Sequence, residues 1–200
     1  MPDMTLLDTI YAQRAIRRFR PDPVPQEVIE QLIAAAVHAP SGGNRQPWSF
    51  VVVRDQALKE QIGEWYLDGW NTTYASDPSK PHNALYRSAE TLAHHLAETP
   101  VLILACLAGG GGSITSGSSI YPAVQNLMLA ATAMGLGTVI TTFHRRHEDE
   151  VKALLGIPEE VHTAALIPLG YPAEGEHFGG ARRRPIAEIT HYDRWGSTPD

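Results

Sequence analysis

The chain has 200 residues, of which 43% are hydrophobic and 19% are charged, a composition typical of a globular domain. Its formal net charge of −6 gives no reason to expect nucleic acid or an anionic membrane as partner, so an anion site has to come from local basic clusters. The single cysteine, Cys106, excludes an intramolecular disulfide. We expect one domain over residues 1–200, with an extension over residues 175–200.

The start of the chain, MPDMTLLDTI, lacks the basic residues and the long apolar core of a signal peptide. No apolar run reaches the roughly 18 residues that a membrane helix needs. These patterns predict a soluble protein in a reducing cytoplasm. Cys106 falls in an apolar, strand-like stretch, which predicts a core residue and not a nucleophile.

The first half of the chain predicts four helices and one strand. Apolar residues with helical spacing follow Thr5, a suitable N-cap, and predict a helix that carries the arginines at 14 and 17 and ends before Pro21. A second helix is predicted over 26–39, up to Pro40. The β-branched stretch 48–55 predicts a buried strand. We then expect a helix over 56–70, a polar loop over 71–83 and a helix over 84–97.

The second half alternates strands and helices. Strands are predicted over 99–108, 138–143 and 162–172. The Gly- and Ser-rich stretch 109–119 predicts a flexible loop, and the long apolar stretch from 119 to Gly135 predicts a helix in the core. A short helix is expected over 147–156. The whole pattern predicts a layered α+β or α/β domain.

Several well-known motifs are missing from the sequence. It contains no G-x-G-x-x-G after a strand, no G-x-x-x-x-G-K-[ST], no G-x-S-x-G and no H-E-x-x-H. His144 and His147 are three residues apart, a spacing that a metal ion can use, but they fall between a predicted strand and a predicted helix. A solvated turn is therefore the preferred interpretation of these histidines, and we expect no metal.

Arginines gather near the end of the first predicted helix and again in the tail. Arg14 and Arg17 are three apart, so on a helix they lie on one side and can bind one phosphate together. The alternative is a solvated charged face.

The stretch APSGGNRQPWSFVVV, residues 39–53, is richer in polar and glycine residues than a simple connection needs. Gly42 and Gly43 allow a ligand to approach the backbone closely, and Ser41, Asn44 and Gln46 add hydrogen-bonding groups. The loop is suited to gripping the edge of a flat polar heterocycle. The alternative is an elaborate helix stop.

Six segments occur in a fixed order and together span nearly the whole chain. They are QRAIRRFRPDPVP, APSGGNRQPWSFVVV, YPAVQNLMLAATAMGLGTVITTF, LLGIPEEV, ALIPLGYP and RRRPIAEITHYDRW. In this order they resemble the nitroreductase superfamily of FMN-dependent oxidoreductases. The resemblance implies an α+β sandwich with a mostly antiparallel central sheet flanked by helices, and an intertwined homodimer whose C-terminal arm reaches the partner.

The resemblance also implies an FMN site between the two subunits. The N-terminal arginine segment and a late arginine hold the phosphate and ribityl chain, but Gln13 and Ala15 depart from the family's basic and serine residues. The loop at Pro40 contacts the isoalloxazine ring from the second subunit, and the strand end at 140–142 passes near the flavin edge. The implied contacts are Gln13, Arg14, Ala15, Arg17, Pro40, Ser41, Gly42, Asn44, Ile140, Thr141, Thr142 and Arg183. Gln125 and Asn126 fit a polar pair in the dimer seam at least as well as a flavin contact.

The chemistry implied by the family belongs to the cofactor, so no side chain is expected to act as a nucleophile. FMN accepts hydride from NADH or NADPH and then reduces a nitroaromatic, a quinone or a similar electron-poor molecule by a ping-pong mechanism. The aromatic residues between 65 and 86 are candidates for a pocket lid, or alternatively for packing and dimer contacts. These are Trp65, Tyr66, Trp70, Tyr74 and Tyr86, with Arg87 as a candidate contact for an anionic substrate.

Three other readings stay open at this level. One is a superfamily relative with other flavin chemistry, such as reductive dehalogenation or flavin breakdown. Another is a flavin-binding storage or sensing protein with little turnover, which Gln13 and Ala15 favour slightly. The last is a binding module without flavin, which leaves the arginine clusters and the glycine loop unexplained.

Overall fold

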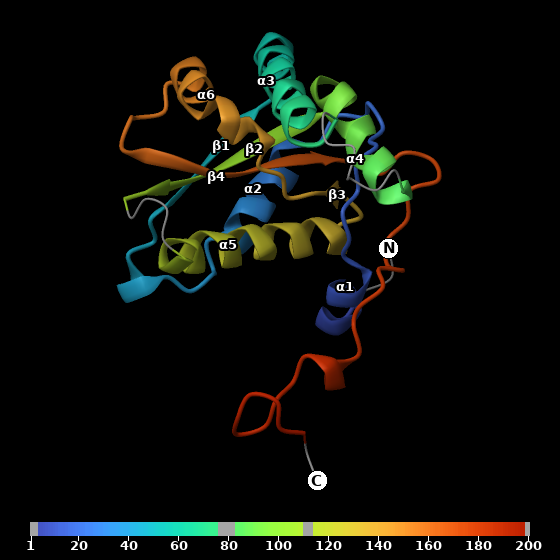
Figure 1. The fold of residues 1–200 in the computed structure, drawn as a ribbon. Helices are drawn as coiled ribbons and strands as arrows, with labels where there is room; N and C mark the ends of the chain where they lie inside the picture. The colour runs from blue at the N-terminus through green and yellow to red at the C-terminus, as the bar shows by residue number, and fades with distance from the viewer. Residues whose placement is uncertain (1–3, 76–82, 110–113, 199–200) are drawn as a thin grey trace.

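The computed structural model describes residues 4–75, 83–109 and 114–198. The sheet runs through the middle of the molecule and helices cover both of its faces (Figure 1). The helices are α1 (Leu6–Ala12), α2 (Gln26–Ala36), α3 (Gln56–Trp70), α4 (Ala84–His95), α5 (Ile114–Ala133) and α6 (Glu148–Leu155), and the strands are β1 (Trp48–Val53), β2 (Val101–Ala108), β3 (Gly137–Thr138) and β4 (Val161–Gly170).

The strands form one antiparallel sheet in the order β1-β2-β4-β3. Strand β2 pairs with β1 from Trp48↔Leu107 to Val53↔Leu102. It pairs with β4 on its other side, so its backbone groups are satisfied along both edges, and β4 in turn lies between β2 and β3. This arrangement confirms the predicted α+β class with an antiparallel sheet.

Side chains of β2 alternate between two hydrophobic clusters, one on each face of the sheet. Ile103 and Ala105 belong to the cluster that contains α2 and α5. Leu102 and Leu104 belong to the cluster that contains α3, α4 and α6. Both faces of the strand are therefore buried, which is why its sequence is apolar without alternation.

Helix α5 lies under the sheet beside α2, as its apolar sequence predicts (Figure 1). Leu127 and Ala131 are fully buried on the side that faces the sheet. The burial of the helix is not complete on every side, because Tyr121 on α5 and Met134, directly after the helix, are exposed. This open side leaves apolar surface on the described chain.

The first helix is shorter than its sequence predicts. Helix α1 ends at Ala12, and Gln13 already has φ −60° and ψ 128°. Ala15 forms a parallel bridge with Thr138, and the Ile16 amide donates to the Thr138 carbonyl at 3.0 Å. The helical spacing of the side chains is overridden because the backbone of this segment pairs with the sheet edge instead.

Two predicted loops are partly helical. Residues Asn71–Ala75 continue α3 as a π-helical turn, which places the Tyr74 ring on the Trp70 ring at a centroid distance of 5.1 Å. The predicted loop over 109–119 becomes helix from Ile114, and the remaining parts of both loops, 76–82 and 110–113, lie outside the described residues.

The strand predicted over 138–143 is mostly irregular. Its ordered part is the two-residue strand β3, and beyond it Thr141 exchanges two backbone hydrogen bonds with Leu166 of β4. The chain leaves the ladder here and lines a pocket.

Beyond β4 the chain first follows the segment after α1, where the Ala173 amide donates to the Arg18 carbonyl at 3.0 Å. It then passes α1 and leaves the sheet as a long extended arm (Figure 1). It carries exposed apolar side chains, and Trp195 is 92% exposed. Among the helices that the structure describes, none combines the length and the apolar character needed to cross a membrane.

Candidate functional site: a basic and aromatic pocket

The arginines that follow α1 do not share one side of a helix, so that prediction is wrong. The segment is extended, and side chains three residues apart in an extended chain point to opposite sides. Arg14 turns to the tail, where its Nη1 donates to the Gly179 carbonyl at 2.9 Å and lies 3.0 Å from His177 Nε2. Arg17 turns instead into a pocket beside the sheet.

Arg17 is half-buried and has no hydrogen bond or ion pair with any other described residue. Burial lowers the pKa of its guanidinium, because removal from water disfavours the charged form. A partly desolvated cation without a hydrogen-bonded or ion-paired partner is typical of a site for an anion or a carbonyl oxygen.

The other predicted phosphate ligands are not gathered around Arg17. Arg183 is exposed in the tail, where its Nη1 donates to the Arg182 carbonyl at 3.1 Å. Within the described residues no hydrogen bond joins it to Arg14 or Arg17. Gln13 and Ala15 lie in the extended segment on either side of Arg14, and Ala15 has no hydroxyl to offer a phosphate.

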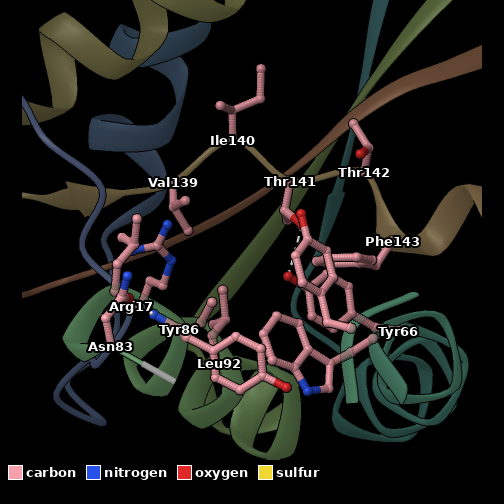
Figure 2. A pocket seen from close by; sticks show the side chains of 14 residues that line it. Arg17, Tyr66, Asn83, Tyr86, Leu92, Val139, Ile140, Thr141, Thr142 and Phe143 are labelled. Carbon is pink, nitrogen blue, oxygen red and sulfur yellow. Dashed lines mark hydrogen bonds between the residues drawn. The ribbon is translucent and has the colours of Figure 1, made fainter. Parts of the chain in front are cut away.

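The pocket beside Arg17 has a volume of about 370 Å³ and lies between α3, α4 and the 139–143 segment (Figure 2). Three of the predicted flavin-edge residues, at 140–142, line it together with Arg17. Four of the five predicted lid aromatics line it too, whereas Trp65 stacks on His147 instead. The lining residues are Arg17, Tyr66, Trp70, Tyr74, Asn83, Leu85, Tyr86, Ala89, Leu92, Val139, Ile140, Thr141, Thr142 and Phe143.

Phe143 and Asn83 were not predicted as pocket residues. Phe143 packs edge-on against Tyr66, Trp70 and Tyr74, with centroid distances of 5.4 to 5.6 Å. An aromatic residue directly after the Thr141–Thr142 pair is the signal that sequence reasoning passed over. Arg87 is exposed and is not among the lining residues.

A pair of hydroxyl groups lies inside this pocket. Tyr66 Oη and Thr141 Oγ1 are 2.7 Å apart, and both side chains are buried (Figure 2). Burial raises the pKa of Tyr66 to about 12, so its phenol keeps its proton at neutral pH. The pocket therefore offers hydrogen-bond donors at one point and positive charge at another.

The glycine loop lies at the other end of the sheet from this pocket. Its 3₁₀ turn, Gly42–Asn44, precedes Trp48, which pairs with Leu107 near the end of β2. Arg17 lies near the opposite end of β2. Ala15, two residues before it, bridges to Thr138 of β3, and Thr138 pairs with Leu169 of β4. Leu169 in turn pairs with Val101, the first residue of β2. The length of β2 separates the two places by on the order of 20 Å, at about 3.3 Å per residue. One chain therefore does not bring Pro40, Ser41, Gly42 and Asn44 to Arg17.

The loop itself is held in an unusual backbone conformation. Gly43, Asn44 and Gln46 have φ of 60°, 51° and 50°, a region that non-glycine residues rarely occupy. The Gly42 amide donates to Ser119 Oγ at 3.3 Å, which ties the loop to α5. Strained, exposed backbone of this kind is common in ligand-contacting loops.

The polar pair on α5 has a structural role in the described chain. Asn126 Nδ2 donates to the Ala35 carbonyl at 3.4 Å and so joins α5 to α2, and Gln125 is exposed. Neither residue lines the pocket around Arg17.

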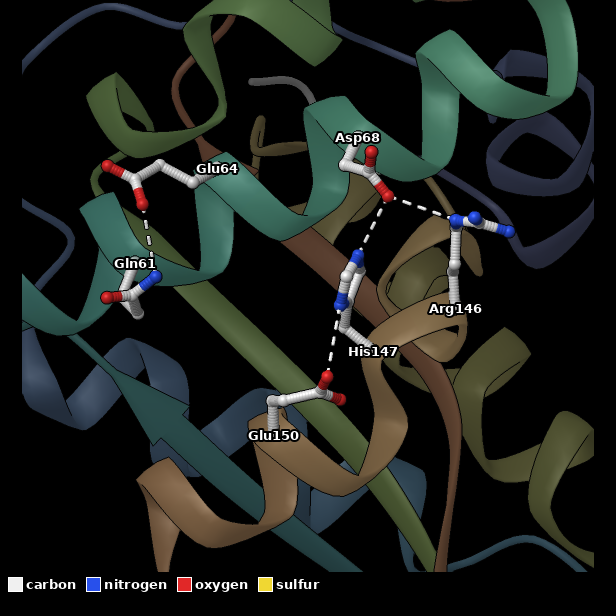
Figure 3. Close-up of polar contacts among 6 residues, drawn as sticks. All are labelled: Gln61, Glu64, Asp68, Arg146, His147 and Glu150. Carbon is white, nitrogen blue, oxygen red and sulfur yellow. Dashed lines mark hydrogen bonds and ion pairs between the residues drawn. The ribbon is translucent and has the colours of Figure 1, made fainter.

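A surface cluster clamps α3 to the turn that carries Phe143. Asp68 accepts from His147 Nε2 at 2.8 Å and from Arg146 Nε at 3.0 Å, and His147 Nδ1 lies 3.4 Å from Glu150 (Figure 3). The hydrogen bond to Asp68 raises the pKa of His147, and the hydrogen bonds from His147 and Arg146 lower the pKa of Asp68. The cluster connects two of the elements that wall the pocket.

Asp68→Asn is expected to bring the pKa of His147 back toward 6.5, because the charged acceptor of its hydrogen bond is lost. The contribution of His147 to stability is present below pH 6.5 and is lost as pH rises through its raised pKa. The contribution of Asp68 is present above pH 3.8 and is lost as pH falls. NMR titration of the His147 ring protons measures the change, and an unchanged midpoint in the variant contradicts it.

His144 is not in a solvated turn, so that prediction is wrong. Its side chain is fully buried, and neither ring nitrogen has a hydrogen-bond partner among the described residues. Burial lowers the pKa of His144 to about 4. The described residues contain no group of three or more His, Cys, Asp or Glu side chains placed to hold a metal ion. Cys106 is a buried core residue, as predicted, and burial raises its pKa to about 11.

An antiparallel sheet between two helical layers is the fold of the nitroreductase-type flavoproteins. The chain belongs to the nitroreductase family: the sequence profile described as Nitroreductase family matches residues 10–171.

Relatives of known name extend over most of the chain. An NADH dehydrogenase of Thermus thermophilus is 34% identical over 180 residues, which cover 81% of this chain and 84% of that protein. An iodotyrosine deiodinase of Thermotoga neapolitana is 32% identical over 168 residues, covering 84% and 88%. The solved structure of oxidised iodotyrosine deiodinase bound to FMN and 3-iodo-L-tyrosine superposes with a TM-score of 0.77 at 28% identity, covering 94% of this chain and 100% of that chain.

Proposed function

We propose that this chain is an FMN-dependent oxidoreductase that takes hydride from NADH or NADPH and reduces flat, electron-poor molecules such as nitroaromatics or quinones. The observation that carries the proposal is Arg17, a half-buried cation that forms no hydrogen bond or ion pair with a described residue and opens into an aromatic-walled pocket. The family membership and the names of the relatives support the choice of cofactor and donor.

The residues around the pocket fit a flavin. Arg17 provides positive charge for the phosphate and ribityl end or for an anionic ring edge, and Ile140 and Thr142 provide backbone and hydroxyl groups. The amide and carbonyl of Thr141, which lies between them, are already used by Leu166, and its hydroxyl is paired with Tyr66. Bound FMN supplies the hydride transfer itself. The chain binds and orients the reactants, and the walls formed by Trp70, Tyr86 and Phe143 exclude water and stack on flat molecules.

The working unit in this proposal is a homodimer. The Pro40–Asn44 loop is about a strand length from Arg17, so a second copy has to supply it to the cofactor. Exposed apolar residues support association: Leu6 of α1 is 70% exposed, and the arm exposes Ile186 and Trp195. An apolar surface of this kind is typical of a protein interface.

Reductive deiodination is a second candidate, because several relatives carry that name. The described lining of the pocket contains Arg17 as a charged side chain and no carboxylate. The ammonium group of an amino-acid substrate therefore has no counter-charge among these residues. This favours neutral electron acceptors over 3-iodo-L-tyrosine.

The test is the visible spectrum of the purified protein under anaerobic conditions, before and after addition of NADH or NADPH. We expect a flavin band that bleaches within seconds and returns on addition of a quinone. A flavin band that persists with both nucleotides supports a storage or sensing role instead. No flavin band after incubation with FMN contradicts the proposal.

A further inference from the structure

The hydroxyl pair of Tyr66 and Thr141 has one O–H group more than the hydrogen bond between them requires. Tyr66 and Thr141 each carry one O–H, and the hydrogen bond between them uses one of the two. Neither hydroxyl has another hydrogen-bond partner among the described residues. One hydroxyl hydrogen is therefore left over, whichever group donates within the pair.

The leftover hydrogen lies in buried surroundings next to the cavity. Tyr66 is 2% exposed and Thr141 is 9% exposed, and both line the pocket. A buried donor without an acceptor destabilises the state in which it is left unpaired. Solvent can satisfy it while the pocket is open, and a ligand that displaces this solvent has to offer an acceptor in its place.

Both hydroxyls are held in fixed positions. The Thr141 amide donates to the Leu166 carbonyl at 3.0 Å, and the Leu166 amide donates back to Thr141 at 2.9 Å. The Tyr66 ring meets Phe143 edge-on at 5.4 Å. A donor that is already oriented needs no reorganisation when charge develops on its acceptor.

We propose that the Tyr66–Thr141 hydroxyl pair donates a hydrogen bond to an oxygen of the electron acceptor, and so selects molecules with a carbonyl or nitro oxygen over flat molecules without one. This inference rests on the proposed function. As the acceptor is reduced, its oxygen gains negative charge and the hydrogen bond strengthens. The pair keeps its own protons, and the proton that completes reduction comes from water.

The decisive variant is Tyr66→Phe/Thr141→Val, because either single variant leaves one hydroxyl free to donate. The flavin is first reduced anaerobically, and reoxidation is then followed with duroquinone and with ferricyanide, an acceptor that takes electrons without such a hydrogen bond. We expect the duroquinone rate to fall about 10- to 100-fold, with the ferricyanide rate and the rate of reduction by NADH unchanged. Tyr171→Phe, a hydroxyl deletion outside the pocket, is the matched control and leaves all three rates unchanged.

A binding measurement separates the acceptor from the cofactor. In the double variant the affinity for FMN is expected to stay the same, while acetophenone loses its affinity relative to ethylbenzene about tenfold. A wild-type rate with duroquinone, or a loss of FMN affinity with normal duroquinone reduction, overturns the proposal. Failure of NADH and NADPH to reduce the wild-type protein contradicts the proposed function. The titrations with FMN and with acetophenone against ethylbenzene still decide the role of the Tyr66–Thr141 pair in that case.

A spectroscopic test needs no variant and covers the case in which the double variant does not fold. The infrared carbonyl stretch of acetophenone bound to the oxidised wild-type protein is expected at lower frequency than in an apolar solvent. A stretch at the apolar-solvent frequency overturns the proposal.

Discussion

Arg17→Ala is expected to weaken FMN binding by about 10- to 100-fold, since a charge-assisted hydrogen bond contributes about 1.5–3 kcal/mol. Arg17 is the charged side chain that lines the described pocket, and it has no competing partner within the described chain. Its charge is therefore free for a ligand. Fluorescence titration of FMN into the flavin-free protein measures the affinity directly.

Arg18→Ala is the matched control for this experiment. Arg18 Nε lies 2.8 Å from Glu176 Oε1, so its charge is already paired, and its loss is expected to change FMN affinity less than about threefold. Arg183→Ala tests the late arginine, whose guanidinium is exposed in the arm. Unchanged FMN affinity in the Arg17→Ala/Arg183→Ala double variant would falsify the assignment of both residues to the cofactor.

Acid is expected to destabilise the protein through His144. Its pKa is lowered from 6.5 to about 4 by burial, so the unfolded chain binds a proton at a higher pH than the folded chain does. Stability is then complete above pH 6.5, falls as pH drops toward 4 and changes little below that. The loss amounts to about 3 kcal/mol in all, and to about 2 kcal/mol between pH 7 and pH 5.

The check is the free energy of unfolding by urea at pH 7 and at pH 5, for the wild type and for His144→Phe. For each protein we compare the change in the free energy of unfolding between pH 7 and pH 5. A change in packing that lowers stability equally at both pH values therefore cancels. We expect the variant to lose most of the acid-induced decrease. His38→Phe removes an exposed histidine and is expected to retain the decrease. An equal decrease in His144→Phe means that the acid sensitivity lies elsewhere.

Much of the secondary structure follows from local sequence. Helices α2, α3 and α6 match the predicted helices closely, because their apolar residues repeat with the helical period and their ends carry Pro25, Asp55 or Gly156. Strand β2 is equally clear, since an apolar run of this length fits a strand buried on both faces. The order of six motifs was enough to indicate the family, which the profile match confirms.

The sequence predicted many of the residues of the candidate site, but not how they are arranged around one pocket. Arg17, the 140–142 segment and four aromatic residues were all identified, but their common pocket depends on contacts between elements far apart in the chain. Asn83 gave no local signal of its own, and the signal for Phe143 was only its place directly after the Thr141–Thr142 pair. The Tyr66–Thr141 hydrogen bond joins residues 75 positions apart, and nothing in either local sequence specifies it.

The sequence by itself determined most of the helices and strands and which family the chain resembles, because burial leaves a periodic pattern in the residues along each element. The tertiary structure decided the rest: it drew residues 13–17 into extended pairing with Thr138, which sent Arg14 to the arm and Arg17 into the pocket. It also placed the Gly42–Asn44 turn at the far end of β2. The physical reason is that a local pattern records how deeply a side chain is buried and not which distant group it meets.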